Sequence, residues 1–318
     1  MTLVSYGSYT DLTFGANLRS TRTLVVATLL AGLALFWTSP VPSLHAQITT
    51  IERTLFVCAL DMDGKPVQGL GPEAFDVRED GVKREILRVS RATEPIDIAL
   101  LVDNSTAASP QIVFFRNGLT SFVKKMSTGN HIAVVTLADR PTIRLDYSND
   151  MEALSKSVGS LFAQPMSAMT LLDAVIETSK GFERRETTPR AIMVAVFTDG
   201  REYTYAYSPD AIEALQRAKV PLHAVTIGQF PHNEERSMRE RSLFLDAGPN
   251  QSGGQRITML SPTGLEPALD KLATELLSQY KVVYARPESL IKPSKVRVSA
   301  GRPDLVVHGA PSRGENGV

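Results

Sequence analysis

The stretch Ile96-Asp97-Ile98-Ala99-Leu100-Leu101-Val102-Asp103-Asn104-Ser105-Thr106-Ala107 decides the fold of this chain. Its first seven residues form a short apolar run rich in Ile, Leu and Val, which is typical of a buried parallel strand. Asp103 and Ser105 follow, two positions apart, at the carboxyl end of that strand. Open α/β sheets bind their ligands at this edge. The stretch therefore predicts a central strand with a polar site beside it.

Outward from this strand, apolar strands and helix-like segments alternate along the chain. The expected strands are 131–137, 141–147 (an edge hairpin partner), 191–198, 222–227, 255–260 and 281–285. The expected helices are 111–126, 151–162, 171–182, 208–219 and 265–279. The stretch 229–254 is polar, and residues 250–254 within it are interpreted as a loop. Strands alternating with helices of this length predict an α/β fold, a doubly wound and mostly parallel sheet of the Rossmann-like kind.

Two further loops carry oxygen ligands at the same edge of the predicted sheet. Thr170 directly precedes the helix 171–182, and Asp199 follows the strand 191–198 in the string Thr198-Asp199-Gly200. Two carboxylates and two hydroxyls on three loops form a set of hard oxygen ligands for a cation. The candidate metal ligands are Asp103, Ser105, Thr170 and Asp199. Taken singly, Asp103 and Asp199 are also compatible with loop hydrogen bonding and helix capping, since both precede helices.

Segments on both sides of the α/β region predict a small flanking β module. Residues 47–93 contain a strand at 54–60 and the hairpin signal Asp80-Gly81 between two more strands. Two strand-like runs lie in 287–311, beyond the α/β region 94–286. Because an isolated hairpin is marginal in water, we expect them to pair with the N-terminal module. Residues 312–318 are expected to be a frayed polar tail.

The first 46 residues have the pattern of an export signal. Arg19 and Arg22 precede the uncharged apolar run 24–37, and Ser43-Leu44-His45-Ala46 places a small residue before Gln47. The run has ~14 residues, short of the ~20 that span a bilayer and suited to a signal peptide. We predict a signal peptide at 1–46, a periplasmic or extracellular location, and no integral membrane span after cleavage. The alternative is an anchor formed by an uncleaved N-terminal segment.

The order and spacing of these motifs resembles bacterial VWFA-related proteins, in which a short β segment precedes a von Willebrand factor type A domain. The resemblance covers roughly residues 54–310 and includes Asp63–Leu70, Phe75–Gly81, Thr170–Ala174 and Thr198–Gly200. It implies a metal-ion-dependent adhesion site, whose pattern is Asp-x-Ser-x-Ser, then Thr, then Asp. In this family Ser105 and Thr170 would ligate Mg²⁺ or Mn²⁺ directly. Asp103 and Asp199 would act through water, and a protein partner would supply an acidic side chain as the last ligand.

One position departs from the family pattern, because Ala107 stands where the second Ser is expected. This change removes a hydroxyl ligand from an ion that demands near-octahedral oxygen geometry. Three outcomes stay open: weak binding with a water in the gap, binding restored by a substitute such as Ser109, or a metal-free binding domain. Thr106 is expected to point away from the ion.

Composition and missing motifs exclude other function classes. Lys+Arg and Asp+Glu both number 34, so the basic excess expected of a nucleic-acid binder is absent. No Gly-x-Ser-x-Gly, His-Glu-x-x-His or phosphate-loop motif occurs, and we expect no enzymatic activity. The single cysteine, Cys58, allows no intrachain disulfide and is expected to be a small buried hydrophobe.

Two functions from different classes therefore remain. One is an exported adhesion or scaffold module that engages an acidic group of a protein partner through a cation. The other is a metal-independent structural scaffold of an envelope complex. Tyr203 and Tyr205 follow Asp199 and are candidates for a partner-binding rim, because Tyr is favoured at interfaces. Packing of this loop on the following helix is the alternative.

Overall fold

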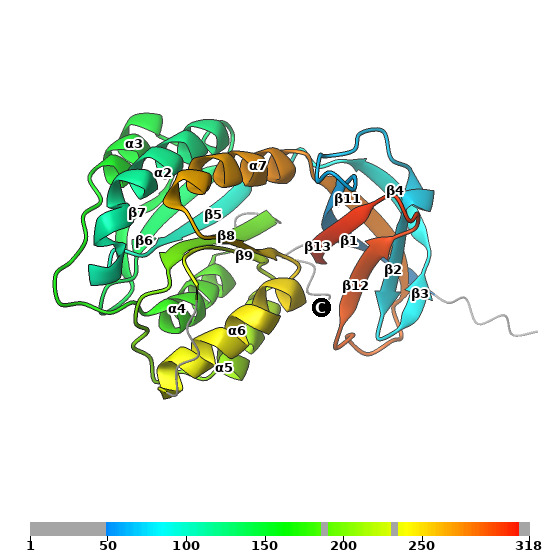
Figure 1. Cartoon of the computed structure of the whole chain (residues 1–318). Helices are drawn as coiled ribbons and strands as arrows, with labels where there is room; N and C mark the ends of the chain where they lie inside the picture. Colours follow the sequence, from blue (N-terminus) through cyan, green and yellow to red (C-terminus); the bar gives the residue numbers. More distant parts are fainter. Residues whose placement is uncertain (1–48, 186–189, 230–234, 312–318) are drawn as a thin grey trace, which may run out of the picture. The chain divides into compact units, whose positions relative to one another are not determined.

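The structure is a computed structural model, and it describes residues 49–185, 190–229 and 235–311 (Figure 1). The predicted signal peptide at 1–46 and the predicted tail at 312–318 lie outside the described residues. Within the described ranges, no helix is long and apolar enough to span a membrane.

A six-stranded sheet forms the centre of the α/β region, in the strand order β10-β9-β8-β5-β6-β7. Every neighbouring pair is parallel except β6 and β7, which are antiparallel at one edge. The strands are β5 (Ile96–Val102), β6 (His131–Thr136), β7 (Thr142–Ser148), β8 (Arg190–Thr198), β9 (Leu222–Ile227) and β10 (Gln255–Met259). The predicted fold class, a doubly wound and mostly parallel sheet, is confirmed.

Helices cover both faces of this sheet, and each face has its own core (Figure 1). One face carries α2 (Ile112–Met126), α3 (Met151–Gly159) and α7 (Leu265–Leu277). The other carries α4 (Leu171–Arg184), α5 (Ser208–Ala218) and α6 (Arg236–Ser252). Side chains of a strand alternate between faces, so Ile98 and Leu100 of β5 enter the first core, and Ala99 and Leu101 the second. This burial on both faces explains the continuous apolar run in the sequence.

Two antiparallel sheets flank the α/β region. The first has the order β13-β1-β11-β4 and the second the order β12-β2-β3. Their strands are β1 (Thr50–Leu60), β2 (Phe75–Glu79), β3 (Val82–Arg84), β4 (Ile86–Arg91), β11 (Tyr280–Pro287), β12 (Val296–Ala300) and β13 (Val306–Pro311). Thus β13 pairs with β1 and β12 pairs with β2, so both C-terminal strands join sheets that begin in the N-terminal segment. Short 3-10 helices occur at η1 (Pro72–Ala74), η2 (Thr106–Gln111) and η3 (Pro262–Gly264).

The structure contradicts the prediction of a last α/β strand at 281–285. These residues belong to β11, which pairs with β1 and β4 in the antiparallel sheet. A strand that follows a helix has the same local pattern whichever sheet it joins. Here the chain leaves the α/β region through Ser278 and Gln279, directly after α7.

The polar stretch 229–254, for which the sequence predicted no helix, contains α6 (Arg236–Ser252), and the loop predicted at 250–254 is wrong for its first three residues. The buried apolar residues of α6, Met238, Phe244 and Leu245, are few and are separated by charged residues, which hid their helical spacing. The helix ends at Gly253, whose φ of 88° is the left-handed conformation that favours glycine.

Cys58 is buried in β1, and burial raises the pKa of its thiol to about 12. The thiol is therefore protonated at neutral pH and unreactive, as a buried structural cysteine is.

Candidate metal site at the carboxyl edge of the sheet

Asp103 is a buried carboxylate fixed entirely by neutral donors. Its backbone N–H donates to Val196 (2.9 Å), which continues the ladder between β5 and β8. Oδ1 accepts from the Ser105 N–H (2.8 Å), and Oδ2 accepts from the Thr198 hydroxyl and N–H (2.6 and 3.1 Å). Asp103 forms no ion pair with any described residue, and a buried charge requires compensation. The buried Arg241 guanidinium attracts both Asp103 and Asp199 electrostatically and offsets part of their charge, and a bound cation would offset more.

Ser105 has a buried hydroxyl that no described residue satisfies. Its side chain is 1% exposed, and its Oγ has no hydrogen-bond partner among the described residues. Buried hydroxyls without a partner are uncommon in folded proteins. Because a hydroxyl oxygen is a hard ligand, a cation at this place would satisfy it, and the residue fits the expected role.

Thr170 is held against the same edge through Leu137. Its N–H and its Oγ1 both donate to the Leu137 carbonyl (3.0 and 2.8 Å), which leaves lone pairs of Oγ1 for another partner. The Asn104 side chain accepts from the N–H groups of Leu137 and Ala138 (3.2 and 2.9 Å). These bonds tie the loop after β5 to the loop before α4, so the structure brings Ser105 and Thr170 to one edge.

Asp199 is half-buried at the carboxyl end of β8. Its N–H donates to Ile227 (3.1 Å), and its Oδ2 accepts from the Gln229 N–H (3.1 Å). Thr198 links this loop to Asp103, because its hydroxyl donates to Asp103 and accepts from the Gly200 N–H (3.3 Å). The third predicted loop therefore adjoins the first.

A family model of the von Willebrand factor type A domain matches residues 97–242, which contain all four candidate ligands. Residues 97–242 are a von Willebrand factor type A (VWA) domain.

Solved structures of similar fold include VWA domains from other organisms. The vWF domain of the type V pili tip protein Mfa5 from Porphyromonas gingivalis is 14% identical, with 57% of this chain and 95% of that chain covered and a TM-score of 0.43. The structure of von Willebrand factor type A from Catenulispora acidiphila is 13% identical, with 74% of this chain and 72% of that chain covered and a TM-score of 0.46. No curated protein sequence matched the chain.

Ala107 packs directly against the third loop of the VWA domain. A Cβ atom added to Gly200 would lie 2.2 Å from the Ala107 Cβ, so the two residues are in close contact. As expected, the Thr106 hydroxyl points to another loop, where it donates to Gln164 (3.1 Å) and accepts from Ser167 (2.9 Å). Ser109 is exposed on η2, and nothing in its position supports it as a substitute ligand.

A buried arginine supports the backbone of the Asp199 loop, and the sequence alone did not indicate it. Arg241 of α6 is 0% exposed and donates to the carbonyls of Gly200 (2.6 Å) and Asp199 (3.5 Å). Its guanidinium lies 4.0 Å from the Glu202 carboxylate, and burial raises the pKa of Glu202 to about 8. Because no helix was predicted within 229–254, Arg241 was not recognised as a core residue. Only the spacing of Met238, Arg241 and Leu245 by three and four residues could have indicated a shared helix face.

The two predicted rim residues are exposed near the site. Tyr203 and Tyr205 are 54% and 75% exposed, and their hydroxyls lie 2.9 Å apart. The Tyr203 N–H donates to Met169 (2.7 Å), which places this loop beside Thr170. Arg236 of α6 donates to the Tyr205 carbonyl (3.4 Å) and so helps to fix the backbone of the rim.

Gly228 is the residue against which the Asp199 carboxylate packs. Its φ is +111°, and an added Cβ would lie 2.3 Å from Asp199 Cγ. We expect Gly228→Ala to displace the carboxylate and to destabilise the fold by roughly 1–3 kcal/mol, the cost of a strained backbone plus a contact. Thermal denaturation measures the effect. Gly129→Ala is the matched control, because Gly129 also has a positive φ but has nothing within 4 Å. Equal losses in both variants would show that the Asp199 contact contributes nothing.

Proposed function

We propose that the VWA domain binds a protein partner through Mg²⁺ or Mn²⁺ held by Asp103, Ser105, Thr170 and Asp199. The observation that carries this proposal is the buried Ser105 hydroxyl without a partner, beside a buried Asp103 carboxylate that forms no ion pair within the described residues. Ser105 and Thr170 would contact the ion through their hydroxyl oxygens. Asp103 and Asp199 would accept hydrogen bonds from its waters.

An acidic group of the partner would complete the coordination. With only hydroxyls as direct protein ligands, the ion keeps enough positive charge to attract a carboxylate, which is a preferred oxygen ligand. Tyr203 and Tyr205 would add contact area at the rim. We assign the domain no catalytic role, and we include in the proposal export through a signal peptide at residues 1–46.

The runner-up function is a metal-independent scaffold of an envelope complex. One observation favours it: the methyl group of Ala107 packs against Gly200 where the family pattern has a hydroxyl ligand. Without that oxygen, the ion would need an additional water, at a loss of affinity.

Calorimetric titration of Mn²⁺ tests the proposal. We expect Asp103→Ala to abolish binding, because it removes the carboxylate that offsets the ion's charge and orients its waters. Ala107→Ser is expected to tighten binding by roughly tenfold, equivalent to about 1.4 kcal/mol, because it restores an oxygen ligand to a preformed shell. Asp63→Ala, which removes an exposed carboxylate in a turn of the N-terminal segment, is the control and should titrate as wild type.

Two outcomes would decide against the cation. If wild type and Asp103→Ala give equal heats, the ion binds elsewhere. If neither wild type nor Ala107→Ser gives heat, the metal-independent scaffold is the better account.

A further inference from the structure

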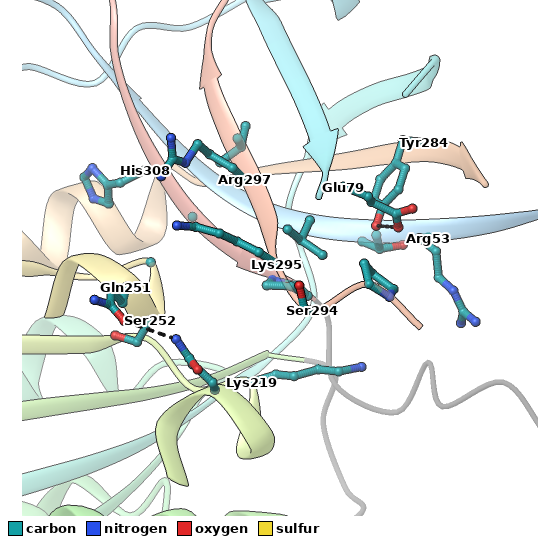
Figure 2. A pocket seen from close by; sticks show the side chains of 18 of the residues that line it. Arg53, Glu79, Lys219, Gln251, Ser252, Tyr284, Ser294, Lys295, Arg297 and His308 are labelled. Carbon is teal, nitrogen blue, oxygen red and sulfur yellow. Dashed lines mark hydrogen bonds between the residues drawn. The ribbon is translucent and has the colours of Figure 1, made fainter. Parts of the chain in front are cut away.

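A basic cleft lies away from the candidate metal site. It has a volume of about 620 Å³ and is lined by the two antiparallel sheets and by the C-terminal ends of α5 and α6 (Figure 2). Its basic lining residues are Arg53, Lys219, Arg286, Lys292, Lys295 and Arg297. Figure 2 shows Lys295 and Arg297 on one side of the cleft, with Lys219 and Gln251 on the other.

The one carboxylate among the described lining residues does not neutralise the cleft. Glu79 is 2% exposed and already accepts from Arg84 Nε (2.9 Å), Arg286 Nε (3.1 Å) and the Tyr284 hydroxyl (2.9 Å). Lys292, Lys295 and Arg297 form no ion pair with any residue that the structure describes. Positive charge is thus concentrated here, although the chain as a whole is neutral.

The loop that carries Lys295 is fixed before any ligand arrives. The Asp80 carboxylate accepts from the Ser294 hydroxyl (2.6 Å), the Ser294 N–H (3.1 Å) and the Lys295 N–H (2.8 Å). The Asp80 N–H donates in return to the Lys295 carbonyl (2.9 Å). A fixed loop loses less conformational freedom on binding, so the backbone that carries Lys295 is preorganised.

Lys219 stands at a position that normally selects glycine. It ends α5 with a φ of 53° and a ψ of 46°, the left-handed conformation in which a side chain is disfavoured. The chain therefore places a lysine beside the cleft in spite of an unfavourable backbone conformation.

We propose that this basic cleft binds a ligand that bears two or more phosphate groups. Phosphate oxygens accept several charge-assisted hydrogen bonds from different directions, which suits cations gathered from separate elements. The volume is within the range of small-ligand sites, roughly 300–1,000 Å³. Among the described lining residues, only Tyr284 and His308 carry aromatic rings. Tyr284 is 3% exposed and the His308 ring lies against that of the buried His223, so neither offers an open stacking platform for a nucleobase.

Calorimetric titration of tripolyphosphate into the full chain, in metal-free buffer, tests this site. The variant Lys295→Ala/Arg297→Ala should bind tripolyphosphate about tenfold or more weakly than wild type. Added salt should weaken the binding of tripolyphosphate by wild type, because it screens the charges. The matched control is Lys124→Ala/Lys156→Ala, which removes the same charge from exposed positions on α2 and α3 and should bind as wild type. Asp103→Ala should also bind as wild type, which separates this site from the proposed metal site.

Lys219→Gly is a second test variant, chosen because it should fold at least as well as wild type. Because glycine adopts a positive φ without steric cost, this variant should keep or raise the melting temperature while binding tripolyphosphate more weakly. No binding by wild type, equal binding by wild type and the Lys295→Ala/Arg297→Ala variant, or an equal loss in the Lys124→Ala/Lys156→Ala control would each overturn the proposal. Hexaglutamate binding as tightly as tripolyphosphate would also overturn it, since the site would then recognise acidic peptide.

Two sources of phosphate can be distinguished by vesicles. Flotation with phosphatidylcholine vesicles that contain cardiolipin, whose headgroup carries two phosphates, would support a lipid headgroup if it is lost in Lys295→Ala/Arg297→Ala. Tripolyphosphate binding without flotation would support a soluble ligand.

Discussion

Replacing Arg241 with methionine is expected to lower the free energy of unfolding by roughly 2–4 kcal/mol, because the carbonyls of Gly200 and Asp199 lose their donor at a cost of about 1–3 kcal/mol each. Burial raises the pKa of Glu202 to about 8, so this side chain, 4.0 Å from Arg241, is mostly neutral at pH 7 and is not left as an unpaired charge. The carbonyl of Gly200 would lose its 2.6 Å donor in a place where water does not reach the arginine. We also expect weaker Mn²⁺ binding, because the Asp199 loop would lose its support.

Urea unfolding at pH 7 measures this effect. Arg239→Met is the matched control, because Arg239 is an exposed arginine of the same helix and its loss should leave stability nearly unchanged. A second variant, Arg241→Met with Glu202→Leu, also removes the buried carboxyl group whose Oε2 has no hydrogen-bond partner among the described residues, and it should recover part of the lost stability. If Arg241→Met unfolds at the same urea concentration as Arg239→Met, the buried arginine does not support the site.

The position of the candidate site could be predicted from sequence because parallel strands bring their carboxyl ends to one edge. Asp103 and Asp199 each follow a buried strand, and Thr170 precedes a helix, so their loops must lie near that edge. Comparison with the family's Asp-x-Ser-x-Ser pattern also shows the loss of a hydroxyl at Ala107. It does not show that Gly200 faces the methyl group, because this contact joins loops that are far apart in the chain.

The parts that sequence reasoning missed depend on long-range pairing. Arg241 is an arginine in a polar segment, and arginine is almost never fully buried unless it is paired. Its burial follows from the Gly200 carbonyl and Glu202, which only the fold brings beneath α6. The basic cleft was missed for the same reason, because Lys219 and Arg297 come from distant segments of a chain with equal numbers of acidic and basic residues.

A buried histidine, packed beside a half-buried one, makes the fold sensitive to acid. His223 of β9 is 1% exposed, and neither ring nitrogen has a hydrogen-bond partner among the described residues. Its ring centroid lies 6.2 Å from that of His308 in β13. Burial, and then the nearby His308, lower the pKa of His223 to about 3 from an ordinary value of 6.5. Burial lowers the pKa of His308 as well.

The sign of the effect follows from which state binds the proton. Below pH 6.5 the unfolded chain protonates His223, whereas the folded protein keeps it neutral until about pH 3. The unfolded state therefore gains free energy as the pH falls through this window, and stability decreases. From pH 7 to pH 4 we expect a loss of roughly 3 kcal/mol from His223, as an upper limit, because local opening of β13 would allow protonation at smaller cost.

Urea unfolding of wild type and His223→Leu at pH 7 and pH 4 isolates this contribution from carboxylates that also titrate. His223→Leu keeps an apolar side chain of similar size in the core and has no proton to bind, so it should lose less stability than wild type over the same interval. His308→Leu should retain most of the acid sensitivity, because burial is the larger cause of the lowered pKa of His223 and persists without His308. If His223→Leu and wild type lose the same free energy between the two pH values, His223 must accept its proton as readily in the folded protein as in the unfolded chain.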